Sequence, residues 1–148
     1  MIGAAHNLFN MALIKNSKLA SQAIDFEGFE FGSIHPSDID CVLEFDNKHL
    51  ILIEVKRFGY DIPTGQRLML QRIADSWHGN SIVIKVEHGH GENGDIPLTS
   101  CVVTKYYYKN KWADAKGLES LNSVLYKLAV TWGIDKLKPL ADADFDKI

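Results

Sequence analysis

Residues 35–56 read HPSDIDCVLEFDNKHLILIEVK, and this stretch decides the fold that the sequence predicts. Two strand-like runs, at about 38–45 and 49–56, flank an Asp-Asn-Lys sequence at 46–48 whose residue types are typical of a tight turn. The second run is continuously apolar over 50–53, which indicates a strand buried on both faces under helices. The stretch therefore predicts a β-hairpin whose second strand is central in a sheet.

The register of this hairpin depends on the length of its turn. A three-residue turn over 46–48 places Asp40 directly opposite Glu54 and Asp38 opposite Lys56. A two-residue turn would shift the pairing by one residue and put Asp40 and Glu54 on opposite faces of the sheet. The three-residue turn gives the register in which the charged residues lie on one face of the sheet.

Two carboxylates placed in this way need a counter-charge. Side chains directly opposed on neighbouring strands have Cβ atoms about 4.5–5.5 Å apart, and carboxylates that close repel each other and resist losing water. Lys56 supplies one positive charge for three acids, Asp38, Asp40 and Glu54. A divalent cation would neutralise the rest, since Mg²⁺ typically takes one or two carboxylates with waters and a substrate phosphate. The alternative is a surface hairpin with an ordinary Asp–Lys cross-strand pair.

The rest of the sequence predicts an α/β domain with a mixed central β-sheet flanked by helices. The predicted helices cover about 2–23, 65–78 with Thr64 as the N-cap, and 118–132. Further strands are predicted at 26–31, 81–87 and 98–108, with loops at 57–64 and 88–95. We expect one domain over 1–139, followed by an acidic tail over 140–148.

Composition and charge place the chain among ordinary globular proteins. With 148 residues, 46% of them hydrophobic, and a formal net charge of −3, the chain is neither disordered nor uniformly basic. A local basic groove stays compatible with this net charge. The sequence shows no apolar run near the roughly 20 residues of a membrane helix and no signal-peptide pattern. Cys41 and Cys101 lack the spacing of a zinc or redox site, so we expect free thiols, a cytoplasmic location and no membrane partner.

Asp40, followed fourteen residues later by Glu54-Val55-Lys56, resembles the motif of the PD-(D/E)xK nuclease superfamily. The similarity is to the small resolvase-like and VRR-type members of phages, archaea and other prokaryotes. The preceding PSDID sequence at 36–40 resembles their proline–aspartate lead-in, and Gln66 resembles the glutamine that opens their next helix. The resemblance covers about 36–87 and implies a restriction-endonuclease-like core.

The resemblance also implies a site and an activity. Asp40 and Glu54 would bind Mg²⁺ or Mn²⁺ together with the backbone carbonyl of Val55, Lys56 would contact the attacking water, and Gln66 would support the site. The implied activity is metal-dependent hydrolysis of DNA phosphodiester bonds by an endonuclease, with a structure-selective enzyme as one form of it. A cut through both strands by so small a domain would suggest a homodimer.

The sequence departs from the family pattern at the first helix. Many members carry a glutamate there, whereas residues 1–24 contain no acid. The candidates for an additional acid are Asp38, Glu30 and Glu27. The missing glutamate favours a non-catalytic nucleic-acid-binding or assembly protein that retains a nuclease-like fold. The intact acid pair and lysine of the motif favour the nuclease.

Basic residues near the motif and near a run of aromatic residues are candidate nucleic-acid contacts. Basic side chains interleaved with aromatic rings suit phosphate contact and base stacking; the alternative is a solvated strand end with partly buried tyrosines. The candidates are Arg57, Arg67, Arg72, Lys105, Lys109 and Lys111.

Overall fold

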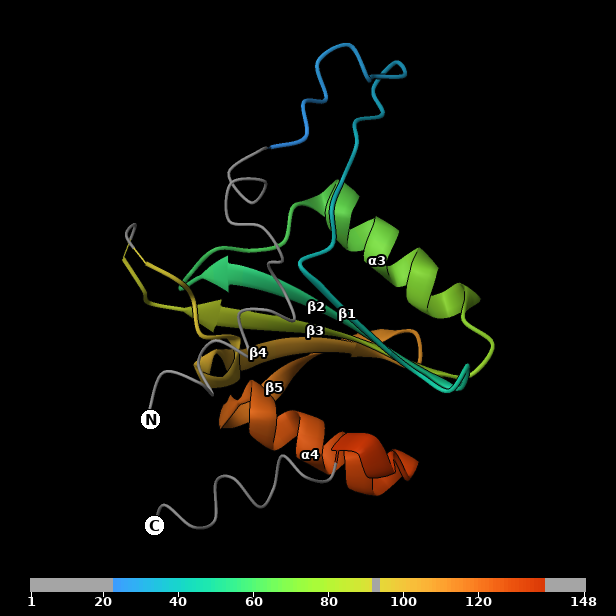
Figure 1. The fold of residues 1–148 in the computed structure, drawn as a ribbon, viewed down its shortest axis with the longest axis vertical. Coiled ribbons are helices and arrows are strands. Elements are labelled where there is room, and N and C mark those ends of the chain that lie inside the picture. Colours follow the sequence, from blue (N-terminus) through green and yellow to red (C-terminus); the bar gives the residue numbers. More distant parts are fainter. Residues whose placement is uncertain (1–22, 92–93, 138–148) are drawn as a thin grey trace, which may run out of the picture. The chain divides into compact units, whose positions relative to one another are not determined.

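The computed structural model of the protein describes residues 23–91 and 94–137 (Figure 1). The chain divides into two units, 1–37 and 38–148, and each is described by itself. The predicted first helix and the acidic tail lie outside the described residues, and the single domain over 1–139 stays a prediction.

In the first unit, the prediction of a strand at 26–31 is wrong. The structure has an isolated antiparallel bridge between Phe31 and Ile34 in its place. Gly28 and Gly32 adopt φ values of 76° and 65°, and these left-handed conformations turn the chain where a strand would have to stay extended.

The second unit contains one mixed five-stranded sheet, which confirms the predicted α/β class. Its strands lie side by side in chain order. Each pairs with its neighbour in antiparallel fashion except the second and third, which are parallel. The strands are β1 (Cys41–Phe45), β2 (His49–Arg57), β3 (Asn80–His88), β4 (Val102–Tyr108) and β5 (Lys111–Ser120).

The two α-helices among the described residues cover opposite faces of this sheet (Figure 1). Helix α3 (Thr64–Ser76) connects β2 to β3 and packs on Leu50 and Leu52. Helix α4 (Leu121–Trp132) packs with the alternate residues of β2 on the other face. Because side chains alternate along a strand, Glu54 and Lys56 share the α3 face with Leu50 and Leu52. Short 3₁₀ segments, η1 (Leu98–Ser100) and η2 (Asp135–Leu137), complete the unit.

The turn between β1 and β2 has three residues, so the hairpin has the first of the two registers considered above. Phe45 pairs with His49, and Asp46 and Asn47 adopt φ values of 52° and 58°. Asp and Asn tolerate this left-handed conformation better than most residues, which explains why this sequence closes the hairpin here.

Several predicted boundaries are wrong by a few residues. The strand predicted at about 38–45 starts at Cys41, because the Asp40 side chain accepts the Val55 N–H in place of a backbone group; Asp38 therefore lies outside β1 and does not pair with Lys56 as predicted. Thr64 is the first residue of α3 and not its N-cap; the N-cap is Pro63, whose ring fixes φ near the observed −54°. The strand predicted at 98–108 starts at Val102, after η1. The helix predicted from residue 118 starts at Leu121, because residues up to Ser120 pair with β4 and the Ser120 side chain caps the helix.

Both cysteines are free, Cys101 buried and Cys41 half-buried. Within residues 23–91 and 94–137, none of the helices has the length and apolarity needed to span a membrane.

Candidate active site

The end of the β1–β2 hairpin brings Asp40 and Glu54 together. Cys41, the first residue of β1, pairs with Ile53, so the preceding Asp40 reaches the level of Glu54. The Asp40 carboxylate accepts a hydrogen bond from the backbone N–H of Val55, with a distance of 2.8 Å between Val55 N and Asp40 Oδ2. The two acids therefore share one edge of the sheet, as the three-residue turn predicted.

The hydrogen bond from Val55 holds the Asp40 side chain against β2. The Val55 amide points toward the β1 side, and backbone groups on a strand alternate sides. The backbone groups of Glu54 therefore point away from β1, and Asp40 lies close enough to the Glu54 side chain to raise the pKa of its carboxyl. The Val55 carbonyl points to the same edge as its amide, where the resemblance implies a metal ligand.

Glu54 is the buried member of the acid pair. Its exposed fraction is 1%, its Oε1 lies 2.8 Å from Lys56 Nζ, and its Oε2 has no hydrogen-bond partner in the part of the chain that the structure describes. Burial raises the pKa of the Glu54 carboxyl, Lys56 acts against this shift, and Asp40 adds to it. The described part of the chain therefore provides a partner for only one of the two carboxylate oxygens of Glu54.

Gln66 connects Lys56 to the segment before β1. Its Oε1 accepts a hydrogen bond from Lys56 Nζ at 3.4 Å, and its Nε2 donates to the backbone carbonyl of Asp38 at 3.3 Å. Gln66 lies in the first turn of α3, and the fully buried Leu70 one turn later anchors that helix to the sheet. The face shared by Gln66 and Leu70 is directed inward, as the helical spacing predicted.

The ligands that this site offers to a metal are two carboxylates and a backbone carbonyl. Among the described residues, no group of three or more His, Cys, Asp or Glu side chains is arranged to hold an ion. Two carboxylates still fit Mg²⁺, which keeps waters and substrate oxygens in its other positions. The partnerless Oε2 of buried Glu54 beside a second carboxylate is the observation that fits a bound cation.

Of the predicted additional acids, Asp38 belongs to the unit that contains the site, and Glu27 and Glu30 do not. Asp38 is exposed and contributes its carbonyl to Gln66. Glu27 and Glu30 belong to the first unit, where the Glu30 carboxylate lies 3.7 Å from His35 Nδ1. Their part in metal binding stays a prediction.

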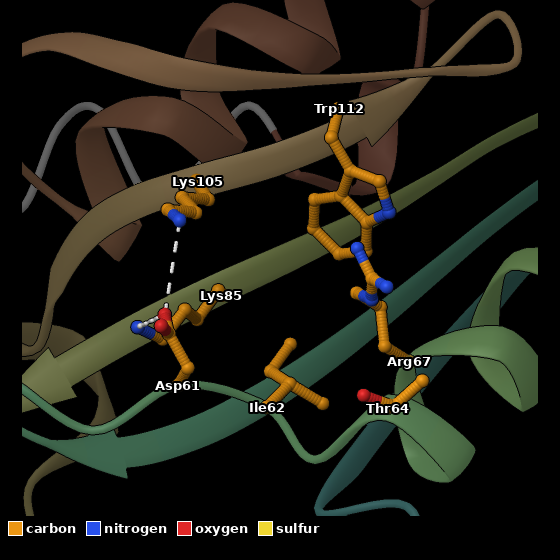
Figure 2. A pocket seen from close by; sticks show the side chains of 7 residues that line it. All are labelled: Asp61, Ile62, Thr64, Arg67, Lys85, Lys105 and Trp112. Atoms are coloured by element: carbon orange, nitrogen blue, oxygen red, sulfur yellow. Dashed lines mark hydrogen bonds and ion pairs between the residues drawn. The ribbon is translucent and has the colours of Figure 1, made fainter.

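Asp61 lines two cavities, and one of them also borders Val55 and Lys56, the residues that follow Glu54 in β2. One, of about 300 Å³, is surrounded by Asp61, Ile62, Thr64, Arg67, Lys85, Lys105 and Trp112 (Figure 2). The other, of about 350 Å³, is surrounded by Val55, Lys56, Arg57, Tyr60, Asp61, Pro63 and His88. The first cavity brings together residues from β3, β4, β5 and α3 that are distant in the sequence.

The structure separates the six basic residues predicted to contact nucleic acid. Arg67, Lys105 and Arg57 line the two cavities near the acid pair. Lys109 lies in the turn between β4 and β5, with its Nζ 5.3 Å from the centre of the Tyr108 ring. Lys111 is exposed at the start of β5, and Arg72 is exposed on α3.

Sequence reasoning missed Lys85, Glu87 and Asp61. Lys85 is 3% exposed and pairs in register with Glu54 on one side and Lys105 on the other. Its signal in the sequence is a lysine inside the otherwise apolar run SIVIKV, because a charge inside a buried strand needs a partner.

The site combines an acid pair, a lysine within hydrogen-bond distance of one acid, and neighbouring cavities lined by basic residues. This set of groups is suited to chemistry on a phosphate ester, in which negative charge has to be neutralised and a water positioned. Comparisons of the chain with protein-family models, with curated proteins and with solved structures found no match.

Proposed function

We propose that the protein is a metal-dependent nuclease that hydrolyses DNA phosphodiester bonds in the cytoplasm, with Asp40, Glu54, Lys56 and Gln66 as its site. The observation that carries this proposal is the buried Glu54, which keeps one carboxylate oxygen without a partner beside Asp40. Desolvating a carboxylate and leaving it unsatisfied is costly, so such a group indicates a ligand that completes it.

Each side chain has a role that its contacts support. Asp40 and Glu54 would hold Mg²⁺ or Mn²⁺, with the Val55 carbonyl as a third oxygen. When bound, the ion supplies charge neutralisation and lowers the pKa of a coordinated water. Lys56 reaches Glu54 at 2.8 Å and would orient the attacking water, and Gln66 holds Lys56 in place through its hydrogen bond.

The topology around the site also supports the proposal. An antiparallel hairpin, a crossover helix and a parallel third strand follow one another in the order that the resemblance implies. Asp40 directly precedes the hairpin, Glu54 lies on its second strand, and Gln66 lies in the first turn of the crossover helix, in the chain order that the resemblance implies.

The test is cleavage of linear duplex, single-stranded, junction and flap DNA in Mg²⁺, in Mn²⁺ and in EDTA. We expect cleavage by the wild type with either metal and none in EDTA, and Lys56→Ala should lose at least about a hundred-fold in rate, the lower range for a positioned proton-transfer group. Lys136→Ala removes an exposed lysine that pairs with Asp46 at the turn end of the hairpin and should cleave like the wild type. Equal cleavage by wild type and Lys56→Ala would remove Lys56 from the mechanism.

A second candidate function is nucleic-acid binding without catalysis. The observation that favours it is that the described residues offer two carboxylates and no third acid at the site. Calorimetric titration of Mg²⁺ or Mn²⁺ into wild type and Asp40→Asn, with and without DNA, separates the two functions. Metal binding that Asp40→Asn abolishes supports the nuclease, whereas DNA binding with no metal binding supports the non-catalytic protein.

Cleavage of both strands of a duplex would call for two copies of the site, because one copy offers a single acid pair. We propose a homodimer on this ground, and size-exclusion chromatography with light scattering in the presence of DNA tests it.

A further inference from the structure

A row of charged residues crosses the sheet at the level of Glu54. In the register of β2, β3 and β4, Glu54 pairs with Lys85 and Lys85 pairs with Lys105. Since neighbouring strands are about 4.8 Å apart, Lys105 starts roughly 10 Å from Glu54. Both lysines reach the same carboxylate, that of Asp61, so they point to the same face of the sheet (Figure 2).

Lys85 is a buried cation whose counter-ions differ in how firmly they are held. Its side chain is 4% exposed, and its Nζ lies 3.4 Å from both Glu87 Oε2 and Asp61 Oδ1. Glu87 is itself buried and also accepts the Gly59 N–H at 2.7 Å, so it is fixed in the structure. Glu87 thus serves as the permanent partner of Lys85.

Asp61, in contrast, is a counter-ion at the surface. Its side chain is 80% exposed, and it belongs to the connection between β2 and α3. Lys105 and Lys85 together hold the pKa of the Asp61 carboxyl below its ordinary value, so it is ionised at neutral pH. Ion pairs of an exposed carboxylate contribute little net free energy, and a competing anion can replace it.

The space around Asp61 is a cavity of about 300 Å³ lined by three cations, Lys85, Lys105 and Arg67. This volume is at the lower end of the range of volumes of small-molecule sites, and it is suited to a single nucleotide with its phosphate group. Trp112 closes one side, and its indole is held by a hydrogen bond from Nε1 to Gln71 Oε1 at 2.8 Å. Figure 2 shows the two lysines, the arginine and the indole around the same space.

We propose that this cavity binds a phosphate group of a nucleic-acid strand, adjacent to the phosphate at the acid pair, and that Asp61 occupies its place in the free protein. The placement beside a scissile phosphate rests on the proposed function; the phosphate site itself does not. Lys85 and Lys105 supply point charges, and Arg67 supplies a planar donor for the phosphate oxygens. Trp112 offers a fixed aromatic face for the neighbouring base.

The test is fluorescence anisotropy of a labelled single-stranded oligonucleotide in EDTA, where cleavage cannot occur. Lys105→Gln and Arg67→Gln should each weaken binding roughly ten-fold, as expected for one charged hydrogen bond. Each should also reduce the slope of log affinity against log salt by about 0.7. Asp61→Asn should instead tighten binding, because it removes the competing anion while keeping the side-chain shape.

Matched controls separate this site from the effect of net charge. Asp46 and Lys136 form another exposed acid–lysine pair, 2.7 Å apart, at the turn end of the hairpin. Asp46→Asn and Lys136→Gln change the net charge by the same amounts and should leave affinity unchanged. Asp61 and Lys105 are 80% and 44% exposed, so their variants should fold, and thermal unfolding checks this. Buried Lys85 is left intact.

Binding measurements with other strands and with inorganic phosphate identify which phosphate group the cavity binds. Circular single strands that bind as tightly as linear ones support an internal phosphate, and a preference for 5′-phosphorylated over 5′-hydroxyl strands supports a terminal one. Inorganic phosphate that displaces the strand in the wild type, and less well in Lys105→Gln, also supports the site. Variants at positions 61 and 105 that bind like their controls would overturn it. This binding assay does not depend on cleavage. A protein that binds the oligonucleotide in this pattern but does not cleave DNA would therefore overturn the proposed nuclease activity and leave the phosphate site standing.

Discussion

Replacing Asp40 by Asn tests whether the acid pair is built for a cation, because the expected change in stability reverses sign when metal is added. Asn keeps a side-chain oxygen that can accept the Val55 N–H, which Asp40 binds at 2.8 Å. It removes the negative charge that faces Glu54. The substitution therefore changes the electrostatics of the pair and little of its hydrogen bonding.

The magnitude follows from the surroundings of the two carboxylates. Two unit charges about 4 Å apart repel by about 1 kcal/mol in water and by about 4 kcal/mol at an effective dielectric constant of 20. Glu54 is buried and Asp40 exposed, which places the pair between these limits, and the Lys56 ammonium offsets part of the repulsion. Without metal, we expect Asp40→Asn to be about 1–2 kcal/mol more stable than the wild type, a rise in Tm of roughly 2–8 °C.

Added metal should reverse this order. A cation at one hundred times its Kd stabilises the wild type by about 2.7 kcal/mol, and the variant, with one carboxylate, should gain far less. The assay is thermal unfolding of both proteins in EDTA and over a Mg²⁺ and Mn²⁺ titration, with Asp46→Asn as a control of equal charge change. A variant less stable than wild type in EDTA would refute the repulsion, and a wild-type Tm that ignores both metals would refute the cation site.

Three further predictions concern packing and charge. Leu70→Ala should cost about 2–5 kcal/mol in a denaturant titration, because this fully buried side chain anchors α3 and leaves a cavity when truncated. Gly79→Ala should lower the Tm clearly, since an added Cβ would overlap the carbonyl oxygen of Lys48, whereas Gly117→Ala meets open space and should not. The lysines around Asp61 lower the pKa of its carboxyl, so its stabilisation is present above the unfolded-state pKa and is lost as pH falls through the folded-state value. Tm measurements against pH should therefore show wild type and Asp61→Asn converging in acid.

The sequence by itself predicted the hairpin and the acid pair. An Asp-Asn-Lys turn, an apolar run and alternating charges are local signals; with a three-residue turn they bring Asp40 to the level of Glu54, and the structure supplied that turn length. The inward position of Gln66 was also predictable, because helical spacing links it to Leu70. Local signals succeed here because these contacts are set by neighbours in the chain.

The tertiary structure alone decided the basic cavity and the extent of β5. Lys85 meets Lys105 and Asp61 through the pairing of strands that are distant in the sequence, and no local pattern encodes that register. The β5 strand extends to Ser120, although its sequence is polar and contains a glycine, because pairing with β4 satisfies its backbone. Strand pairing between distant segments depends on the whole sheet, which is why the acid pair could be read from the sequence and the neighbouring cavity could not.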